Sequence, residues 1–411
     1  MTTTFRPEND AQVREAVAWA AAEEAPLEVV GRGSKRGLGR PVQAGHGIEL
    51  SGLSGITLYE AEELVLAARA GTPLAEIEKA LDEKNQMLAF EPPDLGPLLG
   101  AAEGQGSIGG VLSCNLSGPR RIKAGAARDH FLGLKAVSGR GEAFKSGGRV
   151  VKNVTGYDLC KLIAGAHGTL SALTDVTVKV MPAPEKTRTV LLFGLGDGQA
   201  LSAMTRALGS AHEVSGAAHL PAALAAGSNV SYVARAGGAV TALRVEGPGP
   251  SVDHRCDALR NDLSDLAETE ELHSMNSVTL WRELRDAAPF LAETERLVWR
   301  VSVPPQAGPA FAARIAGASD ARYYYDWGGG LIWLALPAAD GASEDAGAAL
   351  IRGGIAAGEG HATLIRAPAE LRAAVPVFQP QEAANAALTA RIKDGFDPMR
   401  VLNPGRMYAG V

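Results

Sequence analysis

Residues 27–37 read LEVVGRGSKRG, a short apolar run that predicts a strand and leads into a loop of three glycines and three basic residues. The loop is no dinucleotide-binding fingerprint, because its spacing is GxGxxxG and Pro41 follows where the binding helix would begin. It is no P-loop either, because no Gly-Lys-Ser or Gly-Lys-Thr ends it. Glycines let main-chain N–H groups converge on an oxyanion, and Arg32, Lys35 and Arg36 add positive potential. The stretch predicts either a phosphate cradle or a surface turn with solvated cations.

Two further segments are rich in glycine. Residues 104–110 read GQGSIGG, and more glycines follow at Gly118 and Gly125. Because glycine loses more conformational freedom on folding than other residues, this density favours close approach of the backbone to a ligand over a mobile loop. The third segment comprises residues 152–159, KNVTGYDL, and residues 165–170, GAHGTL.

Composition and charge narrow the function classes. The chain has 411 residues and a net charge of -6, yet residues 100–182 carry 11 basic and 5 acidic side chains. Since aromatic residues are not interleaved there, we expect an anionic small molecule and no nucleic acid. The three cysteines form no CxxC pair, so this chain alone predicts neither an iron–sulfur cluster nor a zinc ribbon. No apolar run reaches the roughly 18–20 residues of a membrane span, and no basic leader precedes residues 16–22, so a cytoplasmic protein is expected.

The apolar periodicity predicts two domains. Residues 181–184 contain two prolines and mark a boundary, so a second domain is expected to start near residue 183. Over residues 297–366 the expected order of elements is βαββαβ, which is ferredoxin-like, and a weaker version runs over residues 189–272. The other expected elements are a helix from residue 10, a short helix after Ser107, strands over 56–59, 64–68, 87–90, 130–137 and 170–180, and helices over 73–84, 156–164, 342–357 and 383–393.

Together the glycine segments resemble the FAD-binding domain of the vanillyl-alcohol oxidase and p-cresol methylhydroxylase (PCMH) family. In that family a glycine loop near the N-terminus and a second glycine-rich segment enclose the flavin pyrophosphate. Residues 402–407, LNPGRM, are similar to the family's closing Asn-Pro-Gly element, which returns to the flavin. The resemblance implies an α+β fold: a two-lobed PCMH-type FAD-binding domain over 1–182, an antiparallel α+β (ferredoxin-like) cap over 183–385, and a C-terminal segment over 386–411 that returns to the FAD domain.

The resemblance also implies which residues hold FAD. Some relatives attach the flavin covalently through a histidine in the first loop, where this chain has Lys35 and Arg36, so non-covalent FAD is expected. No metal site is expected. The implied FAD-binding residues are Gly31, Arg32, Gly33, Ser34, Lys35, Arg36, Gly37, Gly104, Gly106, Ser107, Ile108, Gly109, Gly110, Asn115, Gly118, Gly125, Asp129, Gly165, Gly168, Thr169, Leu170 and Asn403.

Three residues are candidates for catalysis, each with an alternative. Lys152 would place positive charge near reduced flavin, or it is a solvated loop cation. Tyr157 would donate a hydrogen bond to the flavin, or it packs at the start of a helix. Arg366 would bind a carboxylate through both of its terminal nitrogens, or it caps the sheet.

Four segments, GRGSKRGLGRP, SGPRRIKAGAARDHFLG, GGRVVKNVTGYDLCKLIAGAHGTL and NPGRMY, are similar to those of one branch of the family. This branch comprises the FAD-binding subunits of bacterial glycolate oxidases, which are also called glycolate dehydrogenases. The branch implies an FAD-dependent oxidoreductase that takes a small 2-hydroxy acid. It also implies two partners, a larger FAD-linked glycolate oxidase subunit and an iron–sulfur subunit, through which the chain would be associated with a membrane.

One departure from the family leaves undecided whether this chain oxidises a substrate by itself. Larger 2-hydroxyacid dehydrogenases of the family carry catalytic and metal-binding histidines in Gly-Asp-Gly-Asn and Glu-His-Gly contexts, and no histidine in the C-terminal half of this chain has such a context. The favoured hypothesis is an FAD-binding subunit that oxidises glycolate to glyoxylate within a complex or relays its electrons. The alternatives are a self-sufficient FAD-dependent oxidase of another 2-hydroxy acid or alcohol, and a non-catalytic scaffold subunit with structural flavin.

Overall fold

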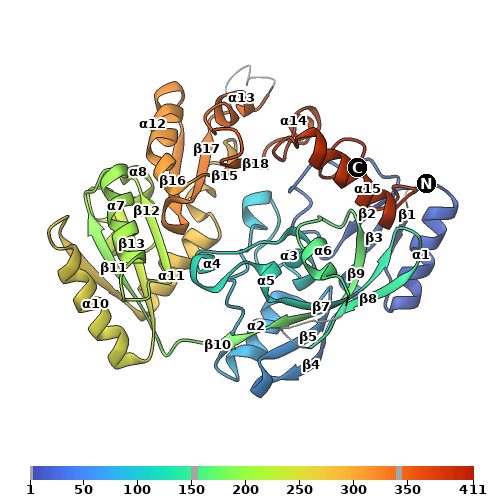
Figure 1. Ribbon diagram of the computed structural model, residues 1–411, viewed down its shortest axis with the longest axis horizontal. Helices are drawn as coiled ribbons and strands as arrows, with labels where there is room; N and C mark the ends of the chain where they lie inside the picture. Colours follow the sequence, from blue (N-terminus) through green and yellow to red (C-terminus); the bar gives the residue numbers. More distant parts are fainter. Residues whose placement is uncertain (1–2, 150–155, 339–344) are drawn as a thin grey trace. The chain divides into compact units, whose positions relative to one another are not determined.

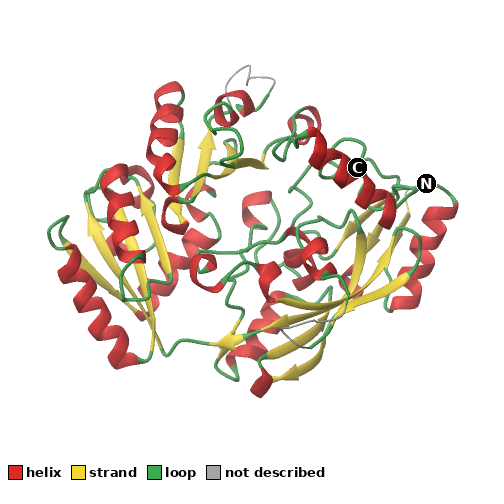
Figure 2. Cartoon of the chain, in the orientation of Figure 1, coloured by secondary structure: helices red, strands yellow, loops and turns green. Residues whose placement is uncertain are grey.

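The computed structural model describes residues 3–149, 156–338 and 345–411, and the described chain forms two compact units (Figure 1). Unit 1 contains the residues up to Ser117, Ala126–Ala183 and Pro376–Val411. Unit 2 contains Gly118–Gly125 and Pro184–Val375. Both units contain helices as well as strands (Figure 2). Within the described ranges, no helix combines the length and the apolar character that crossing a bilayer requires.

Unit 1 is built on two sheets and one short ladder. The parallel sheet has the order β1–β3–β2, with β1 at Thr3–Phe5, β2 at Leu27–Val30 and β3 at His46–Glu49. The antiparallel sheet has the order β4–β5–β9–β7–β8, with β4 at Ile56–Glu60, β5 at Val65–Arg69, β7 at Phe131–Ser138, β8 at Ala143–Gly147 and β9 at Ser171–Lys179. The ladder pairs β6 at Gln86–Met87 with β10 at Met181–Pro182.

The helices of unit 1 are mostly short. They are α1 at Asp10–Ala22, α2 at Leu74–Asp82, α3 at Ile108–Cys114, α5 at Ala127–His130, α6 at Leu159–Ile163 and α15 at Ala383–Phe396, with 3-10 turns η1 at Leu50–Gly52, η2 at Ala61–Glu63 and η3 at Pro97–Leu99. Helix α1 forms because its buried residues recur at helical spacing, at Val13, Ala16, Val17 and Ala20.

One apolar core of unit 1 fixes the start of the first glycine loop. The stripe of α1 packs there against Leu27 of β2, Ile48 of β3 and Leu402 of the C-terminal segment, all of them fully buried. The main chain of Leu27 also pairs with that segment, since its N–H donates to Val401 O at 2.7 Å. Strand β2 therefore ends at a fixed position, and the glycine loop begins directly after it.

Unit 2 contains one eight-stranded sheet made of two βαββαβ repeats, as the sequence predicted. The first repeat is β11 at Lys186–Phe193, α7 at Asp197–Leu208, β12 at Gly216–Leu220, β13 at Val240–Gly247, α10 at Gly249–Leu263 and β14 at Thr269–His273. The second is β15 at Leu297–Ser302, α12 at Gly308–Ala318, β16 at Arg322–Asp326, β17 at Leu331–Leu336, α13 at Ala348–Arg352 and β18 at His361–Arg366. Strand order is β14–β11–β13–β12–β16–β17–β15–β18, with antiparallel pairing throughout.

The two repeats meet at β12 and β16, where only His219 and Tyr325 are in register. Asp197 of α7 reinforces this seam, because one of its carboxylate oxygens accepts from Tyr325 Oη at 2.7 Å and from Tyr323 Oη at 2.8 Å. The remaining elements of unit 2 are α4 at Arg121–Ala124, α8 at Ala222–Ala225, α9 at Ser231–Ala234, α11 at Ser274–Arg285, α14 at Ala369–Ala374, η4 at Ala288–Phe290, η5 at Pro305–Ala307 and η6 at Trp327–Gly329.

Two expected elements differ in the structure. Residues 87–90 form no strand beyond Met87, because the apolar side chains that follow are buried by a turn in which Glu91 N–H donates to Leu88 O. The helix expected over 342–357 is only α13 among the described residues. It begins after Gly347, whose φ of +78° interrupts helical geometry, and its last residue is Arg352.

Candidate functional site

A pocket with about 700 Å³ of empty space lies in unit 1, where β2 runs into the first glycine loop. Of the residues expected to bind FAD, those that line it are Gly31, Arg32, Gly33, Ser34, Lys35, Arg36, Ser107, Gly109, Gly110, Gly168 and Asn403. The first loop, the second glycine segment and the C-terminal segment therefore meet at one cavity.

Two glycines make this cavity possible. A Cβ on Gly31 would lie 2.5 Å from Ser107 Oγ, so the first loop and the start of α3 approach each other too closely for a side chain. Gly33 has a φ of +82°, and a Cβ there would meet no atom within 4 Å. Gly33 lines the pocket, and its open side has room for a larger side chain.

Lys35 supplies a positive charge to the pocket. Its Nζ donates to Ser34 Oγ at 3.2 Å, and no ion pair to a carboxylate is formed by this ammonium among the described residues. Burial lowers the pKa of Lys35 from its usual value, while the Cys114 thiol and the Asp94 carboxylate oppose that effect. An ammonium that is desolvated without a close counter-ion favours an anionic ligand.

Two buried polar atoms of the lining have no partner among the described residues. They are Nε of Arg32 and Oγ of Ser171. Buried donors are normally hydrogen-bonded in folded proteins, so both atoms indicate a polar ligand. Together with Lys35 and the open side of Gly33, they fit the phosphate and hydroxyl groups of a nucleotide cofactor such as FAD.

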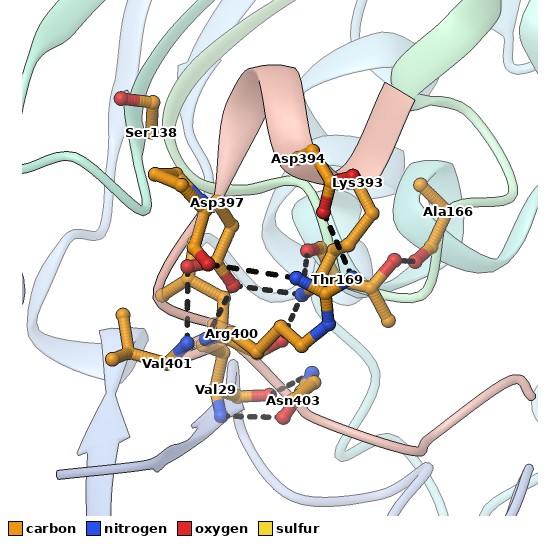
Figure 3. Close-up of polar contacts among 12 residues, drawn as sticks. Val29, Ser138, Ala166, Thr169, Lys393, Asp394, Asp397, Arg400, Val401 and Asn403 are labelled. Carbon is orange, nitrogen blue, oxygen red and sulfur yellow. Dashed lines mark hydrogen bonds and ion pairs between the residues drawn. The ribbon is translucent and has the colours of Figure 1, made fainter. Parts of the chain in front are cut away.

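The C-terminal segment contributes Asn403 and Arg406 to the lining of the pocket. Figure 3 shows Asn403 beside Val29 of β2. The Asn403 side chain accepts from Val29 N at 2.8 Å and donates to His167 O at 2.9 Å, so it joins β2 to the loop before β9. Arg406 is almost fully buried and donates to Lys35 O at 3.1 Å. The closing Asn-Pro-Gly element therefore lies beside the first glycine loop.

Sequence reasoning missed several lining residues. His167 lies within a segment that the sequence singled out, and burial with the nearby Arg406 lowers its pKa to about 3, so its ring is neutral near pH 7. Cys114 ends α3, and burial raises the pKa of its thiol. The missed lining residues are Val29, Val30, Leu50, Ala70, Ser113, Cys114, His167, Leu173, Ser171 and Arg406.

The other residues expected to bind FAD do not line the pocket. Three of them form hydrogen bonds in neighbouring turns. Asn115 ends α3 and accepts from Arg128 N, Asp129 accepts from Ala126 N, and Gly104 N donates to Asp94. Gly118 and Gly125 belong to unit 2. The full set outside the lining is Gly37, Gly104, Gly106, Ile108, Asn115, Gly118, Gly125, Asp129, Gly165, Thr169 and Leu170.

Two of the candidates for catalysis, Tyr157 and Arg366, do not line the pocket. Lys152 is outside the described residues, and Tyr157 is 87% exposed. The Arg366 guanidinium donates to the main-chain carbonyls of Phe290, Arg296 and Glu293, which supports its structural alternative over carboxylate binding.

The protonation of Lys35 gives a pH prediction. Only the ammonium form of Lys35 attracts a diphosphate, and burial lowers the pKa of this group. The affinity for FAD is therefore expected to be constant below that pKa and to fall above it, by up to about tenfold per pH unit, because binding then takes up a proton. Titration of apoprotein with FAD between pH 7 and pH 10 measures this. In Lys35→Arg the fall should move to higher pH; an unchanged profile in Lys35→Arg and Lys35→Met would contradict the assignment.

Comparisons with known proteins identify the family of this chain. A family described as FAD binding domain matches residues 2–147. The chain is 33% identical to glycolate oxidase subunit GlcE of Escherichia coli over 400 residues, which cover 96% of both chains. It is 31% identical over 151 residues to glycolate oxidase subunit GlcD of Bacillus subtilis, which is 37% of this chain and 30% of that protein.

Solved structures show the fold of both units. The structure of p-cresol methylhydroxylase has a TM-score of 0.69 at 14% identity and matches 98% of this chain and 88% of that one. The 4-ethylphenol oxidase from Gulosibacter chungangensis has a TM-score of 0.68 at 16% identity and matches 99% and 89%. The α+β fold of the PCMH type is thereby confirmed. By its near full-length similarity to GlcE, the chain belongs to the family of FAD-binding oxidoreductases that contains this glycolate oxidase subunit.

Proposed function

We propose that this chain is the FAD-binding subunit of a glycolate oxidase complex, in which glycolate is oxidised to glyoxylate or its electrons are relayed through flavin. The similarity to GlcE over 96% of both chains carries the proposal. The pocket supports it, because a nucleotide diphosphate is what the buried Lys35 and the open side of Gly33 would accept.

Unit 1 would be the FAD-binding domain and unit 2 the cap. Bound FAD supplies a two-electron acceptor for the oxidation of a 2-hydroxy acid. Lys35 and Arg32 would neutralise its diphosphate, and Asn403 would hold the first loop in place through its two contacts with Val29. No residue of the first loop is a histidine, so the FAD would be held without a covalent bond.

The proposed partners are a larger FAD-linked glycolate oxidase subunit and an iron–sulfur subunit. The similarity to GlcD of Bacillus subtilis covers 37% of this chain and 30% of that protein, which favours a related but separate flavoprotein as partner. The chain itself would be cytoplasmic, and any association with a membrane would pass through the complex.

The visible spectrum of the purified chain, before and after anaerobic addition of glycolate, tests this proposal. Bound flavin is expected in the isolated chain. A flavin spectrum that bleaches with glycolate assigns the oxidation to this chain, and bleaching that needs the two partner subunits assigns it the relay role. Absence of flavin from a folded chain that also fails to take up added FAD would overturn the proposal.

A further inference from the structure

Two arginines of unit 2 lie over one tryptophan ring. The Cζ of Arg121, in α4, lies 4.2 Å from the centre of the Trp327 ring, and the Cζ of Arg300, in β15, lies 4.8 Å from it. Cation–π contacts of this kind are attractive, but they do not neutralise charge. Two like charges therefore lie beside one aromatic ring.

Trp327 is held firmly in this position. It is 9% exposed, its indole N–H donates to Gly118 O at 3.1 Å, and its main-chain N–H donates to Asp326 at 2.7 Å. Its φ of +52° lies in the left-handed region, which a bulky residue rarely adopts. Strained backbone of this kind persists where the surroundings fix it, and it is frequent at ligand clamps.

Arg121 is also brought to its place by fixed contacts. The neighbouring Arg120 makes two bonds to the Glu246 carboxylate, at 2.8 and 3.0 Å, and both side chains are largely buried. Glu246 additionally accepts from Ser215 Oγ at 2.6 Å. The segment that carries Arg121 is therefore anchored to β13, while Arg121 itself stays open to solvent.

The Arg300 side chain has no hydrogen-bond or ion-pair partner among the described residues. Burial and the nearby Arg121 lower the pKa of Arg300 to about 10, and the Asp326 carboxylate opposes them. That carboxylate is already engaged with the Trp327 N–H. Burial, Arg300 and Arg121 likewise lower the pKa of His361, so its ring adds no charge near pH 7. The buried Arg300 guanidinium thus has no carboxylate bonded to it among the described residues.

The strand register adds polar neighbours to Arg300. Thr363 of β18 lies directly opposite Arg300, and His361 lies opposite Ser302, two residues further along β15. Because residues directly opposite each other in an antiparallel pair point to the same face, these polar groups share the face of Arg300. Trp299 points to the other face, where Arg352 of α13 lies over its ring.

We propose that Arg300 and Arg121, held against Trp327, form a binding site for a small carboxylate in unit 2. A planar guanidinium matches the two oxygens of a carboxylate, and one monoanion supplies the counter-charge that the buried Arg300 lacks. Thr363 and His361 would face a hydroxyl group beside that carboxylate. The choice of a 2-hydroxy acid as ligand rests on the proposed function, whereas the anion site itself does not.

Calorimetric titration of the full chain with glycolate tests the site. Arg300→Gln is expected to weaken glycolate binding by about 10- to 100-fold, since it removes charge-assisted hydrogen bonds. Arg235→Gln is the matched control, because it removes the same charge from an exposed position of unit 2 and should leave binding unchanged. Glycolamide, which is neutral and of similar shape, should bind at least tenfold more weakly than glycolate.

The unfolding temperature and the flavin content of each variant distinguish a failure of the carboxylate site from misfolding and from a failure of the proposed function. Without glycolate, Arg300→Gln should unfold at no lower temperature than the wild type, because one of two neighbouring positive charges is gone. If Arg300→Gln fails to fold, Arg121→Gln at the exposed position is measured in its place, with the same expected loss of glycolate binding. Equal glycolate affinity in the wild type and these variants would overturn the site, and phosphate binding as tight as glycolate would overturn its carboxylate class. The absorbance of bound flavin, recorded on the same samples, tests the proposed function independently.

Discussion

Lys393→Met is expected to lower the free energy of unfolding of unit 1 by about 3–5 kcal/mol, because it leaves the Asp397 carboxylate buried without a counter-ion. Both side chains are fully buried. Figure 3 shows the Lys393 ammonium bonded to the Asp397 carboxylate. The Lys393 ammonium donates to Asp397 at 2.7 Å, to Thr169 O at 2.6 Å and to Leu402 O at 2.9 Å, so all three of its protons are used. The loss should also release FAD, because the same contacts hold the C-terminal segment at the pocket.

Denaturant unfolding, followed by circular dichroism and by flavin fluorescence, measures this loss. A matched control is Asp394→Asn, which removes the exposed ion pair with Arg400 and should change the free energy of unfolding by less than about 1 kcal/mol. The double variant Lys393→Met/Asp397→Asn should recover part of the loss, because no buried charge remains. Val401 N–H and Leu402 N–H donate to separate oxygens of Asp397, and the single amide oxygen of asparagine can keep one of these two bonds. A loss below about 1 kcal/mol in Lys393→Met would show that the pair does not fix unit 1.

Local patterns in the sequence were sufficient for the elements that frame the pocket. Helix α1 follows from apolar residues at helical spacing, strand β2 from a short apolar run, and α3 from Ser107, whose hydroxyl caps the helix start. Each of these signals lies within a few residues of the structure that it determines. The βαββαβ order of unit 2 follows in the same way, because its alternation of patterns is readable segment by segment.

Long-range contacts explain what the sequence did not predict. Arg406 lines the pocket because it donates to the main chain of Lys35, 371 residues away, and no local pattern announces such a contact. Glycine density was a less selective signal: Gly31 is required by its close approach to Ser107, whereas Gly106 lies against the Leu74 side chain and stays outside the lining. Glycine marks close contact of many kinds, so the sequence named more residues than the pocket contains.

Gly33→Asp is expected to weaken FAD binding by at least about 100-fold. The residue lines the pocket, and the direction in which a side chain would point is empty within 4 Å. An aspartate there would place a negative charge beside the bound diphosphate, and two unit charges about 4 Å apart near a protein surface repel by about 4 kcal/mol. Titration of the apoprotein with FAD, followed by quenching of flavin fluorescence, measures the change.

Gly33→Asn separates charge from backbone strain. Asparagine has the shape of aspartate and tolerates the positive φ of this position about equally well, so the two variants differ mainly by one charge. We expect Gly33→Asn to keep FAD affinity within about tenfold of the wild type, because only steric and conformational costs remain. If the two variants lost FAD to the same extent, the added charge would have no effect and only the size of the side chain would matter. The diphosphate would then have to lie elsewhere in the pocket, away from the first glycine loop.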